Sequence, residues 1–162
     1  MKKHFNVAVI SLLTLTLAAC SFSAGTKKDL ATGLSYTYNG FGVSEVYFVG
    51  PDNTPLKSNE VPVGTTVAVV IQGIENYTLK DEKAFPGLSL KVTDEQGTSV
   101  LNNDDLFASG EGYSPTDAGV LRGTVTVGDP MVAGKTYHVT LQAWDKNTTE
   151  SKITAEVDIV VK

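Results

Sequence analysis

The sequence has 162 residues, of which 41% are hydrophobic and 19% are charged, and its net charge is -5. This apolar content excludes an intrinsically disordered chain, and a single cysteine excludes a small domain held together by disulfides. The acidic balance, without any basic stripe, argues against a nucleic-acid-binding protein.

The N-terminus has the parts of a bacterial export signal. Lys2 and Lys3 precede a mostly apolar run over residues 5–17, which is shorter than the roughly 20 residues that span a bilayer. Small residues then lead to a cysteine in Leu17-Ala18-Ala19-Cys20, and this sequence resembles the lipobox of bacterial lipoproteins. The resemblance implies that residues 1–19 are removed and that Cys20 carries the lipid chains, palmitate among them. The alternative is an ordinary signal peptide that ends near a buried cysteine.

Lipidation predicts a protein anchored in the cell envelope, because two or three acyl chains hold a protein stably on a membrane. Ser21 follows the lipidated cysteine, where an aspartate would mark retention in the inner membrane. A serine at this position resembles the default that directs a lipoprotein to the outer membrane. The sequence does not indicate which leaflet the protein occupies. Residues 20–33 are small and polar without a clear period, so they are predicted to form a flexible tether.

From Leu34 onward the pattern alternates with the period of β-strands and is interrupted by turn residues. Residues 65–71 are apolar on both faces, which predicts a central strand that is covered on both sides. Only residues 79–85 and 102–108 are expected to hold a helical turn. The other strands are predicted at 34–38, 43–49, 88–92, 98–101, 121–127, 137–144 and 153–161.

The segment Gly134-Lys135-Thr136-Tyr137-His138-Val139-Thr140-Leu141-Gln142-Ala143-Trp144-Asp145 resembles the penultimate strand of immunoglobulin-like domains of the PKD and cadherin types. The resemblance implies an all-β, immunoglobulin-like antiparallel sandwich of about seven or eight strands over residues 34–162. It places Tyr137 where such folds have a tyrosine corner. It brings no calcium ligands, because Asp145-Lys146-Asn147 lacks the further acidic and amide residues of the cadherin motif.

Few residues point to catalysis. His138 is the one histidine after the signal peptide, and neither a Gly-x-Ser-x-Gly elbow nor a nucleotide-binding glycine loop occurs. Lipidation of Cys20 leaves no free thiol. The prediction is therefore a protein that is not an enzyme and has no required cofactor. A glycan-active enzyme with a carboxylate pair remains a less favoured alternative.

An acidic segment and several aromatic residues remain as candidate binding features. Between Lys91 and Arg122 the chain has no basic residue, and the oxygens of this segment suit calcium. A solvated acidic loop is the favoured interpretation, and a calcium site the alternative. The weak candidate ligands are Asp104, Asp105, Glu111 and Asp117.

Trp144 faces outward on its predicted strand, and exposed aromatic rings stack on sugars or anchor protein interfaces. Trp144, His138 and Tyr113 form the candidate binding face. Two functions follow. The first is a lipid-anchored, non-enzymatic binding or scaffold module for another envelope protein. The second is a carbohydrate-binding lipoprotein, with calcium as a helper.

Overall fold

The computed structural model describes residues 23–162. The predicted signal peptide and the predicted lipidation of Cys20 lie outside these residues. Within them, ten strands and one short helix follow each other along the chain. They are β1 (Ala24–Lys28), β2 (Ser35–Asn39), β3 (Glu45–Val49), β4 (Glu60–Val61), β5 (Thr66–Gln72), β6 (Pro86–Asp94), β7 (Ser99–Asn103), α1 (Pro115–Ala118), β8 (Val120–Thr126), β9 (Thr136–Asp145) and β10 (Lys152–Val161).

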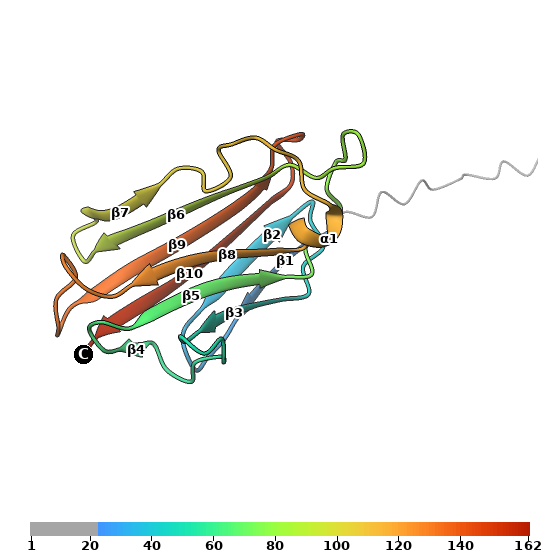
Figure 1. Cartoon of the computed structure of the whole chain (residues 1–162). Coiled ribbons are helices and arrows are strands. Elements are labelled where there is room, and N and C mark those ends of the chain that lie inside the picture. The colour runs from blue at the N-terminus through green and yellow to red at the C-terminus, as the bar shows by residue number, and fades with distance from the viewer. Residues whose placement is uncertain (1–22) are drawn as a thin grey trace, which may run out of the picture.

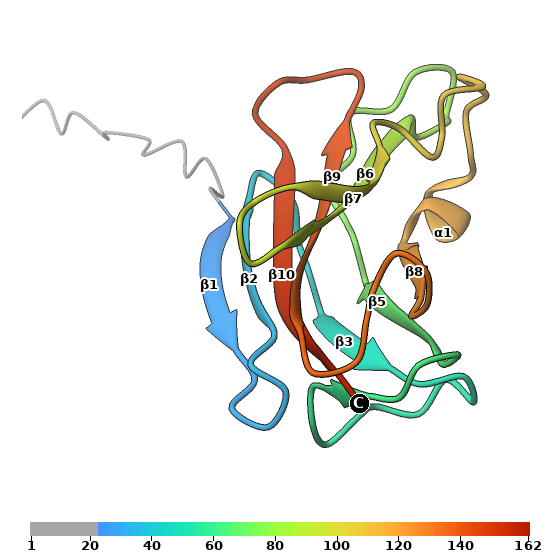
Figure 2. The same cartoon turned by 90° about the vertical axis from the view of Figure 1, so that its left-hand side faces the viewer.

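The strands form two sheets that pack face to face (Figure 1). The larger sheet has the order β1-β2-β10-β9-β6-β7, and the smaller has the order β3-β5-β8. Figure 2 shows the edge of the larger sheet, where the β1–β2 hairpin continues it beyond β10. Strand β4 pairs with the last residues of β10 in parallel, while the other pairings are antiparallel.

This arrangement confirms the predicted all-β, immunoglobulin-like sandwich, with ten strands where about seven or eight were predicted. The smaller sheet has the A-B-E order of such folds, and β10, β9, β6 and β7 have the order G-F-C-C′. The connection that contains α1 takes the place of strand D. The β1–β2 hairpin is an addition to the immunoglobulin-like set of strands.

The core follows from strict alternation on β9 and β10, whose odd-numbered residues point inward and are almost fully buried. Leu141 projects from β9 across the sandwich onto Gly123 of β8. A Cβ at Gly123 would lie 2.3 Å from Leu141 Cδ1, so only glycine leaves room for this contact. Leu88, Leu90 and Val92 of β6 complete the same core layer.

Tyr137 forms the corner contact that the sequence predicted for it. Its ring is buried, with 4% of the residue exposed, and its hydroxyl accepts a hydrogen bond of 3.0 Å from the backbone N–H of Val132. This bond closes the connection between β8 and β9 in the manner of a tyrosine corner.

The predicted central strand over residues 65–71 is confirmed as β5, the middle strand of the smaller sheet. Its inward side chains join the main core. On the outer face, Val70 and Ala68 belong to a second small cluster with Val49, against which Tyr47 packs. Both faces of β5 are therefore covered within this chain.

The flexible tether predicted over residues 20–33 is wrong from Ala24 onward. Residues 24–28 pair with β2 in the larger sheet, and the ring of Tyr38 covers Gly25, its cross-strand neighbour. Asp29 then closes the turn to β2 by accepting hydrogen bonds from Ala31 N and Thr32 N. The sheet therefore begins at Ala24 and not at Leu34.

The two expected helical turns are also wrong. Residues 79–85 form a turn between isolated bridges, and residues 102–108 end β7 and continue into a turn, whereas the helix lies at Pro115–Ala118. Ser114 caps this helix by accepting a hydrogen bond from Asp117 N, and Pro115 begins it. Among the residues in the structure, no helix has the length and apolarity needed to cross a membrane.

Candidate binding face around Trp144

The candidate site lies on the outer face of the larger sheet, near the end of β9. Because the strand alternates, Thr140, Gln142 and Trp144 point away from the core that their neighbours build. The register places Trp144 between Gly87 of β6 and Lys152 of β10. Gln142 lies between Ser89 and Thr154 in the next row, so Trp144 stands at the end of a polar sheet surface.

Gly87 allows the indole of Trp144 to pack against the sheet. A Cβ at Gly87 would lie 2.1 Å from Trp144 Cε2 and 2.4 Å from Nε1, so the ring occupies the space that a side chain would fill. An aromatic ring over a cross-strand glycine is a known device for restoring packing in sheets. The result is a half-buried, positioned ring with part of its surface open to solvent.

Two grooves meet at this ring. The larger, of about 720 Å³, runs between Trp144, Gln142 and the turn that joins β9 to β10. The smaller, of about 380 Å³, runs over β6 and β7 on the other side of the ring. Its polar side chains are Ser89, Lys91, Asn102, Asp104 and Thr140. Trp144 and Gln142 line both grooves, so they form the ridge between them.

The wall of the larger groove is held by Asp145, which is only 1% exposed. One of its carboxylate oxygens accepts a hydrogen bond of 2.6 Å from Thr78 N, and the other accepts one of 2.9 Å from Asn147 N. The Asn147 amide also donates to Thr78 O at 2.7 Å. These bonds fix the β9–β10 turn to the loop before β6, so the groove wall is preformed.

Asp105 and Lys146 fix a third segment to the same turn. Lys146 Nζ lies 2.7 Å from Asp105 Oδ2, and Asp105 Oδ1 accepts hydrogen bonds from Leu88 N and Phe107 N. Partial burial by itself raises the pKa of Asp105, but the ion pair and the two backbone bonds outweigh it and lower the pKa below its usual value. The charged Asp105 side chain thus holds the connection after β7 in place.

The three residues of the predicted binding face do not line a common groove. Trp144 and His138 share the outer face of β9, but they are six positions apart, which is about 20 Å along a strand. His138 is exposed and hydrogen-bonded to Asp158 on β10. Neither His138 nor Tyr113 contributes to the grooves at Trp144.

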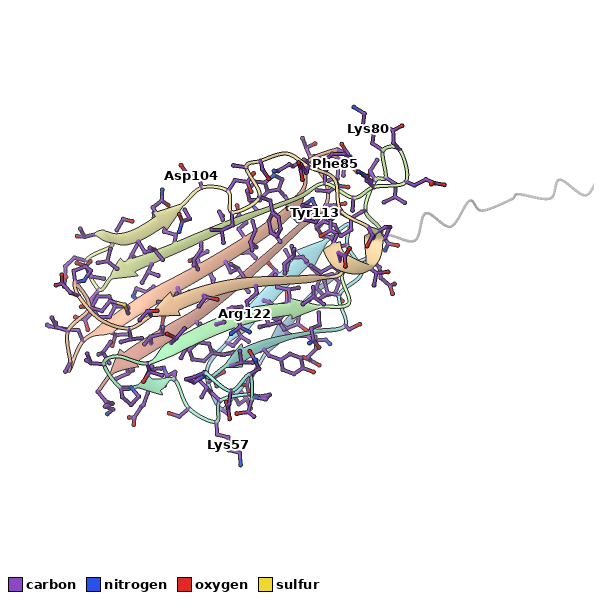
Figure 3. All side chains as sticks on the ribbon, viewed as in Figure 1. Lys57, Lys80, Phe85, Asp104, Tyr113 and Arg122 are labelled. Atoms are coloured by element: carbon purple, nitrogen blue, oxygen red, sulfur yellow. The ribbon has the colours of Figure 1, made fainter. Side chains whose placement is uncertain are left out.

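Tyr113 belongs to the end of the sandwich. Its backbone pairs with that of Ala84, and its ring meets that of Phe107 edge-on, with 5.3 Å between the ring centroids. Figure 3 shows Tyr113 beside Phe85 near α1, apart from Asp104 further along the molecule. Packing between loops therefore accounts for this ring.

The four acidic residues weighed as calcium ligands are not brought together. Asp105 binds Lys146, Asp104 accepts a hydrogen bond from the Asn102 amide, and Asp117 is bonded to Ser114 beside α1. Glu111 is exposed in the loop before α1. Within residues 23–162, no three His, Cys, Asp or Glu side chains gather in a way that could hold a metal ion.

The outward parity of β9 placed Gln142 beside Trp144, but sequence reasoning missed Lys91 and Asn102 as residues that line the same groove. Lys91 and Asn102 are cross-strand neighbours on β6 and β7, and Lys91 also faces Thr140. The alternation of each strand gave the outward parity of these residues. The register between strands brings these residues together, and it depends on turns and on a bulge near Val92. The register could not be predicted from the sequence.

No protein-family model matches the chain, and no curated protein matches it. Among solved structures, the chain is similar to a superoxide reductase (neelaredoxin) from Ignicoccus hospitalis, with a TM-score of 0.42 and 10% sequence identity. The match covers 74% of this chain and 82% of that chain. A likeness at this level carries no argument about function.

Proposed function

We propose that this chain is a lipid-anchored binding module of the cell envelope, which holds another envelope component on the outer face of its larger sheet. The observation that carries the proposal is the Trp144 indole, which is seated on Gly87 and has a groove on each side. Half-buried aromatic rings in preformed, partly polar depressions are the usual anchors of binding sites. The lipobox at Cys20 supports the envelope location.

The polar side chains in the grooves, together with the apolar ring, favour a glycan as the bound component. Amide, hydroxyl and ammonium groups from Gln142, Ser89 and Lys91 line the smaller groove beside the ring, and these donors and acceptors complement sugar hydroxyls. The ring itself offers an apolar surface on which a sugar can stack. An envelope protein that uses Trp144 as an interface anchor is the second candidate, supported by the same exposed ring.

Binding without catalysis is part of the proposal. His138 is exposed on the sheet, and the one hydrogen bond that its side chain makes among residues 23–162 is to Asp158. A hydrolytic triad would also need a nucleophile bonded to the second ring nitrogen. Asp105 and Asp145, which flank the Trp144 region, are occupied by hydrogen bonds that hold the backbone in place.

The test uses the fluorescence of Trp144, which is the single tryptophan of the chain. The full chain in detergent micelles is titrated with soluble fragments of envelope glycans. We expect a saturable change in emission that Gln142→Ala and Lys91→Ala weaken. Thr124→Ala, on the smaller sheet, is the matched control. Binding to immobilised glycan replaces fluorescence for Trp144→Ala, which has no fluorophore.

The outcomes separate the two candidates. Loss of glycan binding in Trp144→Ala but not in Thr124→Ala supports a glycan as the bound component. If no glycan binds, while a protein from the envelope is captured by the wild type and not by Trp144→Ala, the protein-binding candidate replaces it. Equal binding by all variants would contradict the proposed face, and turnover of any glycan would contradict the non-enzymatic role.

A further inference from the structure

A cleft opens between the two sheets at the edge where the β1–β2 hairpin lies against β3. It has a volume of about 410 Å³, which is within the range of small-molecule sites. Its apolar lining comes from Leu34 of the hairpin, from Val46 and Phe48 of β3, and from Leu56 in the following loop. This cleft shares no lining residue with the two grooves at Trp144, which lie on the outer surface of the larger sheet.

The cleft contains a buried hydroxyl group without a partner. Tyr36 of β2 lines it and is only 4% exposed. Among the buried side-chain polar atoms of the described chain, the Tyr36 hydroxyl oxygen is the one that lacks a hydrogen-bond partner. Buried polar groups in folded proteins nearly always form a hydrogen bond, so the unbonded Tyr36 hydroxyl requires an explanation. A ligand that supplies the missing bond is such a reason.

The charges at the mouth of the cleft indicate the kind of group that would meet this hydroxyl. Lys27, the cross-strand neighbour of Tyr36, places its Nζ 5.9 Å from the centroid of the Tyr36 ring. Burial raises the pKa of Tyr36, and an interaction of the Lys27 ammonium with the Tyr36 hydroxyl opposes this rise only in part. The phenol therefore stays protonated, and its O–H, which has no acceptor, can donate. Donor groups on both residues favour an anionic acceptor.

Two carboxylates also lie near the mouth. Asp29 uses both of its oxygens for Ala31 N, Thr32 N and the Thr32 hydroxyl within its own turn. Glu45 makes no salt bridge with Lys27 within 4.0 Å, yet it lines the cleft and adds negative charge there. An anionic ligand would therefore be attracted by Lys27 and repelled by Glu45. Removing each charge in turn should change binding in opposite directions, which tests the sign of the ligand's charge.

We propose that this cleft binds a small apolar molecule that ends in a carboxylate. The apolar body lies against Leu34, Val46 and Phe48, and the carboxylate accepts a hydrogen bond from the Tyr36 hydroxyl and faces the Lys27 ammonium. The ligand class is that of short acyl or arylalkyl carboxylates, in keeping with the size of the cleft.

The probe for this site is 4-phenylbutyrate, with 4-phenylbutanol as its uncharged counterpart. The full chain is held in nanodiscs of zwitterionic lipid, and binding is followed by saturation-transfer NMR against empty nanodiscs. We expect saturable binding that Tyr36→Phe and Lys27→Met each weaken at least about tenfold, because each removes a bond or contact to a charged group. Glu45→Gln should tighten binding. Lys80→Met, which removes an exposed lysine at the opposite end of the sandwich, should have no effect.

A second measurement keeps the test independent of folding. Since the Tyr36 hydroxyl has no partner to lose, Tyr36→Phe should leave the Tm unchanged or raise it. The proposal is overturned if 4-phenylbutyrate does not bind, if Tyr36→Phe binds it as tightly as the wild type, or if 4-phenylbutanol binds equally well. Tighter binding by Lys27→Met would also overturn it, because the ligand would then be a cation.

Discussion

A single glycine determines how Trp144 is presented. The indole fills the space above Gly87, so any side chain at that position must displace the ring. We predict that Gly87→Val moves the Trp144 emission maximum to longer wavelength, because the ring becomes more solvated, and that it weakens ligand binding at this face. Gly128→Val is the matched control, since a Cβ at Gly128 meets nothing within 4 Å. A shift of equal size in both variants would contradict the packing described for Trp144.

The Tyr137 hydroxyl contributes a backbone bond, whereas the Tyr36 hydroxyl does not. Tyr137→Phe should therefore lower the free energy of unfolding by about 1 kcal/mol, the typical value of one net hydrogen bond. Urea denaturation with both phenylalanine variants measures the difference. Equal stability of Tyr137→Phe and the wild type would show that the corner bond contributes nothing.

Asp105 makes stability depend on pH in a defined direction. Its folded pKa is lowered by Lys146 and two backbone N–H groups, so its contribution is present above the unfolded pKa and is lost as the pH falls through the folded pKa. Asp105→Asn should cost about 1–3 kcal/mol at neutral pH, the typical cost of breaking a charged, part-buried network. In strong acid the variant and the wild type should be equally stable in urea denaturation. A difference that persists in acid would contradict the assignment.

At the scale of elements, the strands with long alternating patterns were predictable and the short or polar ones were not. Strands β9 and β10 are fixed by rows of buried odd-numbered residues, which the sequence displays directly. Strand β1 reads Ala-Gly-Thr-Lys-Lys and is mostly exposed, so no hydrophobic pattern marks it. It is held by its pairing with β2, and a local sequence pattern does not predict which strands pair. Helix α1 was marked by Ser114 and Pro115, a capping signal that the prediction overlooked.

Strand β1 should be much less protected than β9, a central strand of the same sheet. It pairs only with β2 and buries little surface, whereas β9 is flanked by β10 and β6. We predict that the amides of Ala24–Lys28 exchange with solvent through local opening, while those of β9 exchange only on global unfolding. Hydrogen-exchange NMR measures both. Equal protection of β1 and β9 would mean that the hairpin is an integral part of the cooperative core.

At the scale of the whole molecule, the sandwich has two unlike outer faces. The smaller sheet covers its own apolar outer residues with Tyr47, and Arg122 donates to Asn53 Oδ1 at 2.6 Å across that face. The larger sheet exposes polar rows that end at Trp144 and its two grooves. This asymmetry is why the proposed function lies on the larger sheet, and it depends on strand register, which the sequence alone did not reveal.

The proposed membrane anchor makes a prediction for the intact cell. Cys20→Ala removes the residue that would carry the lipid, so the protein should appear in the soluble envelope fraction or remain unprocessed. Fractionation followed by mass spectrometry of the N-terminus distinguishes these outcomes, and Ser21→Ala is the neighbouring control. A Cys20→Ala product that is cut before residue 20 and still bound to the membrane would contradict lipidation.

The most direct test of the proposed binding face is site-specific photo-crosslinking in intact cells. A photoreactive residue replaces Gln142, which lines both grooves at Trp144, and in a second strain it replaces Thr124 on the outer face of the smaller sheet. The proposal predicts a defined adduct, with glycan or protein, from position 142 alone, and its loss when Trp144→Ala is added. Adducts from position 124 alone, or equal adducts from both positions, would contradict the claim that the larger sheet carries the function.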